Sequence, residues 1–227
     1  MGDAALQVSV RGEVDRATAA AAAALASRID AAFIPGVYET IPAFISVLVL
    51  YDPLKIARND LIDVLSNLSA TAIHEPPAAR CWEIPSLYHP SAAPDLEAAA
   101  GELGVSVSQL IEAHSTPEYH VYMLGFLPGF PYLGEMPENL HLPRKTVPHI
   151  RIPKGAVAIA GAMTGIYPLE SPGGWNVIGI TPVEIWDTAR NSRPAISAGD
   201  KVVFKPVSER EFERLRAQPG LSPSPLP

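Results

Sequence analysis

Residues 156–180 read AVAIAGAMTGIYPLESPGGWNVIGI, and this stretch decides the fold. Its two apolar runs, AVAIAG at 156–161 and WNVIGI at 175–180, are short, and glycine and proline separate them. Similar short runs lie on either side: YHVYML at 119–124, VEIWD at 183–187 and KVVFKPV at 201–207. Many short strands with frequent turns are typical of a closed barrel or a sandwich. The sequence therefore predicts a mainly-β domain over residues 81–227.

Two short helices are expected ahead of these strands, at 95–102 and 108–114. Pro94 stands just before the first, and Ser106 or Ser108 can cap the second. The chain ends in QPGLSPSPLP, whose proline content predicts either a disordered tail or a packing arm.

The first eighty residues follow a different pattern, in which strands and helices alternate. Apolar residues at every second position of 6–10 indicate a strand, and Asp15 can cap a helix that runs to about Phe33. Two extended segments and a further helix follow, at 37–41, 44–51 and 55–69. This order predicts a small α+β (ferredoxin-like) domain over residues 1–80, with helices on one side of an antiparallel sheet. HEPPAAR, at 74–80, is the expected linker.

The overall composition narrows the possible functions. Lys and Arg number 17 and Asp and Glu number 24, which gives the 227-residue chain a formal net charge of −7. A general nucleic-acid binder needs the opposite sign, so nucleic acid is not expected as a partner. The one cysteine excludes an internal disulfide, and no apolar run approaches the ~20 residues that span a bilayer. A cytoplasmic protein without membrane contact is expected.

Glycine, proline and aromatic residues are concentrated between Gly125 and Trp175. The rings are Phe126, Phe130, Tyr132, Tyr167 and Trp175. Large apolar groups in turns are costly in water, so these rings either fold into the core or line a pocket. The glycines at 161, 165, 173 and 174 allow backbone N–H groups to approach an anion.

Polar side chains in and near the same segment are candidates for ligand contacts. Four cations lie between 144 and 154: Arg144, Lys145, Arg151 and Lys154. The arginine fork suits a carboxylate or phosphate, although a basic group of this kind is often only a solvated surface. Thr164 and Ser171 can hydrogen-bond a substrate. His120 is either an acid or base facing a pocket or a packed strand residue.

Several common catalytic signatures are absent from the sequence. It contains neither a P-loop nor a dinucleotide fingerprint, and Ser171 does not stand in a G-x-S-x-G elbow. The six histidines lack the spacing of a zinc site, so no metal is expected. Cys81 has no basic neighbour and is interpreted as a buried thiol.

Three motifs resemble the signatures of the KipI/PxpB family, whose members are also named the B subunit of 5-oxoprolinase or allophanate hydrolase subunit 1. They are GFLPGFPYLG at 125–134, IPKGAVAIAGAMTGIYP at 152–168 and SPGGWNVIGITP at 171–182. The resemblance covers nearly the whole chain. It implies a cyclophilin-like β-barrel for residues 81–227, behind the α+β domain.

The resemblance also implies a function. Family members act in an ATP-dependent 5-oxoprolinase, which opens 5-oxoproline to glutamate. The implied partners are a PxpC (allophanate hydrolase subunit 2) type subunit and a lactam-utilisation (PxpA-type) subunit, so the isolated chain is expected to be inactive. ATP with Mg²⁺ is shared with these subunits, and no structural metal is implied. The family offers two alternatives: inhibition of a sensor histidine kinase, and a carboxyltransferase-like subunit that handles urea or a similar amide.

The motif positions carry the implied site residues. The predicted substrate-binding residues are Phe130, Tyr132, Arg144, Arg151, Thr164, Gly165, Tyr167, Ser171, Gly173, Gly174 and Trp175, with His120 as a catalytic candidate. The two arginines are expected to clamp a carboxylate or phosphate of a small anionic amide, while the rings exclude water. Met163, His149 and Ile180 depart from the glutamine and two arginines that the resemblance implies.

Overall fold

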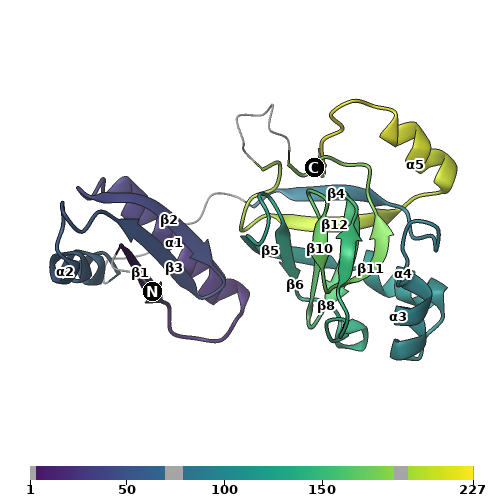
Figure 1. Cartoon of the computed structure of the whole chain (residues 1–227), viewed down its shortest axis with the longest axis horizontal. Helices are drawn as coiled ribbons and strands as arrows, with labels where there is room; N and C mark the ends of the chain where they lie inside the picture. Colours follow the sequence, from purple (N-terminus) through teal and green to yellow (C-terminus); the bar gives the residue numbers. More distant parts are fainter. Residues whose placement is uncertain (1–3, 70–78, 187–193, 227) are drawn as a thin grey trace. The chain divides into compact units, whose positions relative to one another are not determined.

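The computed structural model describes residues 4–69, 79–186 and 194–226. The chain divides into two compact units, Met1–Ala79 and Arg80–Pro227 (Figure 1). Most of the predicted linker HEPPAAR lies outside the described residues. Within the described ranges, no helix is both long and apolar enough to cross a bilayer.

The N-terminal unit has the predicted β, α, β, β, α order. Its elements are β1 (Ala5–Ser9), α1 (Arg16–Ala31), β2 (Val37–Ala43), β3 (Ser46–Tyr51) and α2 (Arg58–Ser69). The three strands are antiparallel in the order β1-β3-β2. Asp15 caps α1 as predicted, because its Oδ1 accepts a hydrogen bond from the Thr18 N–H at 2.7 Å. The helix ends two residues before the predicted Phe33.

Both helices of this unit cover the same face of the sheet. Val47, Val49 and Tyr51 alternate along β3 and are buried, as the two-residue period of a strand requires. They share a core with Leu25 of α1 and Leu61 of α2. The predicted one-sided arrangement is therefore confirmed. A ferredoxin-like unit also needs a fourth strand after α2, and that position falls on residues 70–78, outside the described residues.

The C-terminal unit contains a mixed eight-stranded sheet in the order β11-β8-β9-β6-β5-β12-β4-β13. Its strands are β4 (Cys81–Ser86), β5 (Glu118–Leu124), β6 (Pro131–Gly134), β8 (Ala156–Ala160), β9 (Met163–Ile166), β11 (Asn176–Ile180), β12 (Lys201–Pro206) and β13 (Ser224–Pro225). The pairing of β12 with β4 is parallel and the others are antiparallel. Two shorter strands, β7 (His149–Ile152) and β10 (Ser171–Gly173), pair only with each other.

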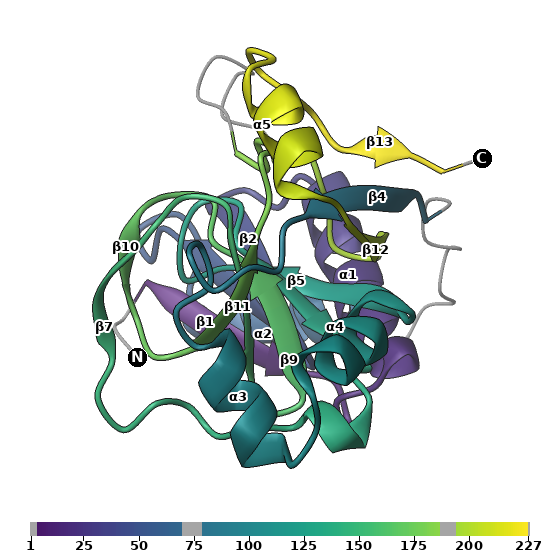
Figure 2. The ribbon, with the colours of Figure 1, turned by 90° about the vertical axis from the view of Figure 1, so that its right-hand side faces the viewer.

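One residue pair connects β11, at one end of the large sheet, to the chain that follows β4 near the other end. Leu87 directly follows β4, and Ile180 ends β11. The two residues exchange backbone hydrogen bonds of 2.8 and 2.9 Å. The C-terminal segment forms β13, which pairs with the outer side of β4 (Figure 2). Next to it, the Leu226 N–H donates to the Cys81 carbonyl. The tail is therefore a packing arm, which was one of the two predicted alternatives.

The strand predicted from VEIWD is wrong for its described part. Val183, Glu184, Ile185 and Trp186 lie in a loop outside the large sheet. The Glu184 N–H donates to the Leu221 carbonyl, the Ile185 carbonyl accepts from the Ala195 N–H, and Trp186 forms an isolated bridge with Pro194. Within the described residues, this segment therefore pairs only at single points.

The described residues of this unit also form helical elements: α3 (Leu96–Leu103), α4 (Val107–Ser115), the 3₁₀ turn η1 (Glu138–Leu140) and α5 (Glu209–Arg216). The first two confirm the predicted short helices, and Ser106 forms a capping box with Gln109 at the start of α4. Sequence reasoning missed α5, because Phe212 is the only buried residue of this charged helix.

Strand β8 separates two layers of packing in this unit. Val157 and Ile159 point into the main core, which α3 and α4 also enter. Ala156, Ala158 and Ala160 point to the opposite face and contact a second apolar cluster. Small side chains on that face leave room for large rings above it, and the candidate site lies there.

Candidate functional site

Four aromatic residues from distant segments meet on the alanine-lined face of β8. We name Phe130, Tyr132, Tyr167 and Trp175 the aromatic cluster. The Phe130 ring centroid lies 5.0 Å from that of Tyr132, 5.1 Å from Tyr167 and 5.4 Å from Trp175, each in an edge-to-face arrangement. The structure thus brings together all four rings that the sequence assigned to one site.

Burial divides the cluster into a packed centre and a rim. Phe130 and Tyr167 are each 1% exposed and Trp175 is 6% exposed, so they act as core and not as pocket walls. Tyr132 is half-buried, and Phe126, which contacts Phe130 and Tyr167, is 60% exposed. A ligand can therefore meet the cluster only at its rim. The sequence predicted that these three central rings contact the substrate directly. In the structure they are buried and support the residues of the rim.

Two of the predicted glycines make room for these rings. A Cβ atom on Gly165 would lie 2.7 Å from Cζ of Phe130 and 2.9 Å from the Pro131 carbonyl oxygen. A Cβ on Gly173 would lie 2.3 Å from the Tyr167 hydroxyl. These glycines are needed for packing, because any side chain would displace a ring. Gly174 has no such neighbour closer than 3.8 Å and stays a candidate for ligand contact.

Thr164 points away from the aromatic cluster into the main core. Its Oγ1 lies 2.8 Å from Nε2 of His114 and donates to the Ala158 carbonyl at 3.1 Å. Nδ1 of His114 lies 2.9 Å from the Tyr88 hydroxyl. Since the Thr164 hydroxyl donates elsewhere, His114 donates through Nε2 and accepts through Nδ1. The predicted substrate contact of Thr164 is thus replaced by a buried structural network.

This network predicts a pH dependence of stability. Burial lowers the pKa of His114 from 6.5 to about 3, so below pH 6.5 the unfolded chain takes up a proton that the folded chain does not. We expect the free energy of unfolding to fall by roughly 1 kcal/mol per pH unit between pH 6.5 and 3 from this residue alone. Urea titrations across that range, with His114→Gln as the control, measure it. An equal pH slope in the variant would assign the effect to other groups.

The two predicted arginines have different surroundings. The Arg151 side chain is 77% exposed and its Nε pairs with Glu170 at 2.7 Å. Arg144 is also exposed but has no hydrogen bond or ion pair with any residue that the structure describes. The structure therefore leaves one guanidinium uncommitted, not a pair that forms a clamp.

The charge of Arg144 lies at the rim of the aromatic cluster. Burial raises the pKa of Tyr132, and it raises the pKa of Tyr167 to about 12. Arg144 acts on both pKa values in the opposite direction. The backbone also runs beside the cluster here: the Lys145 N–H donates to the Gly174 carbonyl at 2.8 Å, and the preceding Gly173 packs closely against the Tyr167 hydroxyl. An aromatic rim with one unpaired cation can bind a small, flat anion.

The remaining predicted residues, His120 and Ser171, make contacts other than with the aromatic cluster. His120 is buried in β5, where its ring packs edge-on against Tyr122 at 5.0 Å between centroids. Ser171 lies in β10 and donates its hydroxyl to the neighbouring Pro172 carbonyl. Catalysis by His120 stays a prediction.

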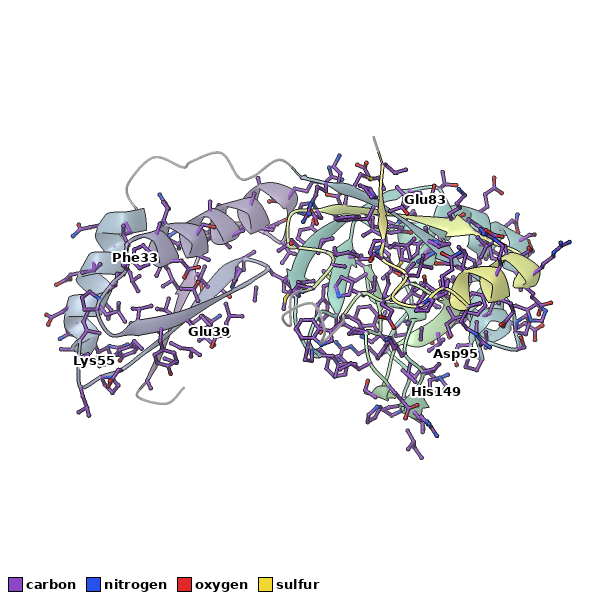
Figure 3. All side chains as sticks on the ribbon, turned by 90° about the horizontal axis from the view of Figure 1, so that it is seen from above. Phe33, Glu39, Lys55, Glu83, Asp95 and His149 are labelled. Atoms are coloured by element: carbon purple, nitrogen blue, oxygen red, sulfur yellow. The ribbon has the colours of Figure 1, made fainter. Side chains whose placement is uncertain are left out.

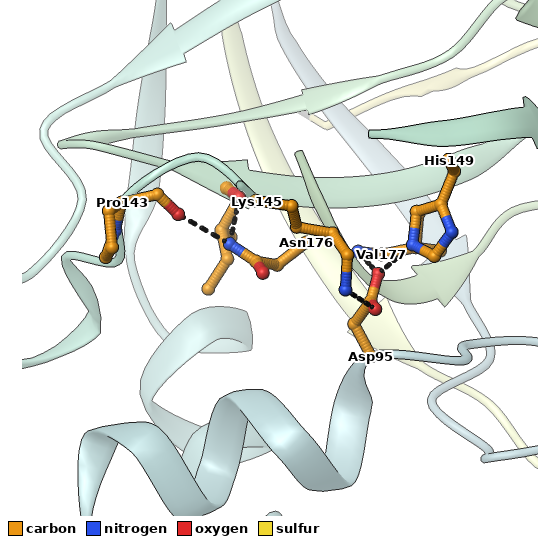
Figure 4. Close-up of polar contacts among 7 residues, drawn as sticks. Asp95, Pro143, Lys145, His149, Asn176 and Val177 are labelled. Atoms are coloured by element: carbon orange, nitrogen blue, oxygen red, sulfur yellow. Dashed lines mark hydrogen bonds and ion pairs between the residues drawn. The ribbon is translucent and has the colours of Figure 1, made fainter. Parts of the chain in front are cut away.

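Sequence reasoning missed a polar cluster next to the basic segment (Figure 4). The Asp95 carboxylate, at the start of α3, binds Nζ of Lys145, Nε2 of His149 at 2.7 Å and the Val177 N–H at 2.8 Å. Burial raises the pKa of Asp95, but the bonds from Lys145 and His149 outweigh it, so the pKa is lowered overall. Figure 3 shows Asp95 beside His149. The basic run alone was a signal, but nothing in sequence linked it to an aspartate some fifty residues earlier.

Metal binding finds no support in the described part of the chain. Among those residues, no three His, Cys, Asp or Glu side chains gather where they could hold an ion. The polar cluster has a single carboxylate between two nitrogen donors, and each of those donors already binds it.

Solved structures share this architecture. The protein TTHA0988 superposes with a TM-score of 0.79 and 36% identity over 90% of this chain, which spans 40% of the TTHA0988 chain. The urea carboxylase of Kluyveromyces lactis superposes with a TM-score of 0.80 over 99% of this chain and 23% of its own. At 18% identity, that second likeness shows the fold alone.

Sequence comparisons identify the family. The family model described as carboxyltransferase domain, subdomain C and D, matches residues 1–196. The chain is 42% identical over 176 residues to the 5-oxoprolinase B subunit of Escherichia coli O157:H7, covering 77% of this chain and 80% of that one. It is 35% identical over 229 residues to the 5-oxoprolinase B subunit of Bacillus subtilis (strain 168), covering 96% and 95%. Matches of this extent show that the chain belongs to the carboxyltransferase subdomain C and D family and, within it, to the KipI/PxpB proteins, the B subunits of 5-oxoprolinase.

Proposed function

We propose that this chain is the B subunit of an ATP-dependent 5-oxoprolinase, which opens 5-oxoproline to glutamate. The observation that carries the proposal is Arg144 beside the aromatic cluster, with a side chain that has no partner among the described residues. 5-Oxoproline is a small five-membered lactam with one carboxylate. A guanidinium binds the carboxylate through two parallel hydrogen bonds, and the rim residues Tyr132 and Phe126 contact the ring.

The reaction explains why ATP is required. The lactam carbonyl is resonance-stabilised and reacts poorly with water. Transfer of a phosphoryl group from ATP to the amide oxygen makes the carbon reactive. Water then adds to that carbon, the ring C–N bond breaks and the nitrogen takes a proton, which leaves an acyl phosphate. A second water hydrolyses the acyl phosphate to the carboxylate of glutamate and inorganic phosphate. In this scheme Arg144 holds the substrate carboxylate in place, and the aromatic residues exclude bulk water from one side.

The remaining parts of the site come from partner subunits in this proposal. The rim lies open on this chain, and no P-loop occurs in its sequence. A PxpC-type subunit is the proposed partner that covers the rim, and a PxpA-type subunit is the proposed third component. ATP and Mg²⁺ are shared between them. A reducing cytoplasm is the compartment that suits a chain with one cysteine.

We also propose that the eight-stranded sheet is a cyclophilin-like barrel. The hydrogen bonds between Leu87 and Ile180 support closure, because they connect the β4 side of the sheet to β11. The single apolar core inside strands β5, β6, β8, β9, β11 and β12 also supports it. Such closure would keep β8 and the aromatic cluster above it in a fixed position.

Co-expression with PxpC-type and PxpA-type subunits tests the proposed function. The purified complex should hydrolyse ATP when 5-oxoproline is added and release glutamate in equal amount. The chain alone should do neither. The control omits each partner in turn. Lack of 5-oxoproline-dependent ATP hydrolysis in every combination would refute the assignment.

A further inference from the structure

We propose that Asp95 is a positioning residue: it fixes the segment 143–149 so that Arg144 presents its guanidinium at the aromatic rim. The inference rests on the proposed role of Arg144 in binding the substrate carboxylate. It adds a residue from the start of α3, which has no contact of its own with that rim.

The backbone is held on both sides of Arg144. The Pro143 carbonyl accepts a hydrogen bond from Nδ2 of Asn176 at 3.0 Å. The Lys145 N–H donates to the Gly174 carbonyl at 2.8 Å. Both ties lead to the segment that starts β11, while the Arg144 side chain stays uncommitted among the described residues.

Asp95 provides the third tie, which acts on side chains. Its own backbone N–H bonds to the Val177 carbonyl at 3.1 Å, and its carboxylate accepts the Val177 N–H. Two hydrogen bonds therefore fix Asp95 to β11, in addition to its bonds with Lys145 and His149. Its side chain is 6% exposed, so salt screens its pairs with Lys145 and His149 less than surface pairs.

The place of Arg144 follows from the bonds of its neighbours. Residues 143–148 belong to no helix or strand, so their course depends on these few ties. The Lys145 side chain binds Asp95, while its backbone N–H binds the Gly174 carbonyl. The preceding Gly173 packs closely against the Tyr167 hydroxyl, so the chain at Arg144 runs beside the aromatic cluster. Without Asp95, the guanidinium would sample many orientations and lose preorganisation.

The test measures 5-oxoproline-dependent ATP hydrolysis by the assembled complex. Asp95→Asn should raise the KM for the lactam substrate about tenfold and leave kcat within about twofold, because the loss falls on substrate binding. Arg144→Ala should raise KM by more, and the double variant should be no worse than Arg144→Ala alone. This lack of additivity shows that Asp95 acts through Arg144, whereas a merely structural role would make the two effects multiply.

Further variants keep the inference testable. Lys145→Met removes one partner of Asp95 and should raise KM in the same way. Lys145→Arg keeps the positive charge and should leave KM close to that of the wild type. These two variants carry the test if Asp95→Asn does not fold. The matched control is Asp200→Asn, which alters another buried carboxylate of this unit that binds Trp82, and its KM should stay unchanged.

The possible outcomes separate the inference from the proposed function. Absence of 5-oxoproline-dependent ATP hydrolysis in the wild-type complex overturns the proposed function. A normal KM for Arg144→Ala in an active complex overturns the role of Arg144 and, with it, the positioning role of Asp95. A raised KM for Arg144→Ala with a normal KM for folded Asp95→Asn or Lys145→Met overturns the positioning role alone. Multiplying effects in the double variant also overturn it.

Discussion

Replacing Arg144 by alanine should lower kcat/KM for the lactam substrate about 100-fold in the assembled enzyme, mainly by raising KM. A hydrogen bond to a charged group contributes about 1.5–3 kcal/mol, and each 1.4 kcal/mol is a factor of ten. A guanidinium with no other partner among the described residues puts its full interaction into the ligand. Steady-state kinetics of ATP hydrolysis with varied 5-oxoproline measure the change.

Arg151→Ala is the matched control for this prediction. It removes the same charge from the same stretch of chain, but the Arg151 guanidinium is paired with Glu170 on the surface. Exposed pairs contribute little, so kcat/KM should stay within about threefold of the wild type. If Arg151→Ala were the more damaging variant, the site would have to be moved to the two-stranded sheet of β7 and β10.

Replacing Phe130 by alanine should lower the free energy of unfolding by about 3–5 kcal/mol. Phe130 lies at the centre of the aromatic cluster, in edge-to-face contact with Tyr132, Tyr167 and Trp175, and packs closely on Gly165. Its removal leaves a cavity that fixed neighbours cannot fill. Urea unfolding followed by tryptophan fluorescence measures the loss.

Phe126→Ala provides the comparison at the rim of the same cluster. Its ring is 60% exposed, so the variant should lose less than about 1 kcal/mol. The same variant should weaken 5-oxoproline binding if Phe126 contacts the substrate ring. Equal destabilisation by the two substitutions would show that the cluster has no rigid centre.

The sequence predicted the elements with a strong local signal. Alternating apolar residues marked β1, and the caps Asp15 and Ser106 marked the starts of α1 and α4. The short strands β7 and β10 escaped detection, because the four residues HIRI and the three residues SPG are too few to show a strand period. VEIWD shows the reverse error, since its described residues, 183–186, alternate like a strand but lie in a loop.

The candidate site was predictable only in part, for a physical reason. Turn glycines and rings indicated where the backbone comes close to an aromatic cluster, but composition does not say which rings are covered. Burial of Phe130 and the inward direction of Thr164 depend on the strand register of β9. The bonds of Asp95 could not be predicted, because a single aspartate before a helix is typical of an N-cap. Its actual partners, Lys145 and His149, come from a distant loop.

Recognition of a small lactam through its carboxylate is the role that Arg144 has in the proposed enzyme. The most direct test compares two ligands in the wild type and in Arg144→Ala: the substrate 5-oxoproline, through its Michaelis constant, and 2-pyrrolidinone, the same ring without the carboxylate, through its inhibition constant. We expect the substitution to raise the first constant about 100-fold and to leave the second unchanged, because only the first ligand has the charge that Arg144 binds. If both constants rose equally, or if neither rose, the result would contradict this role.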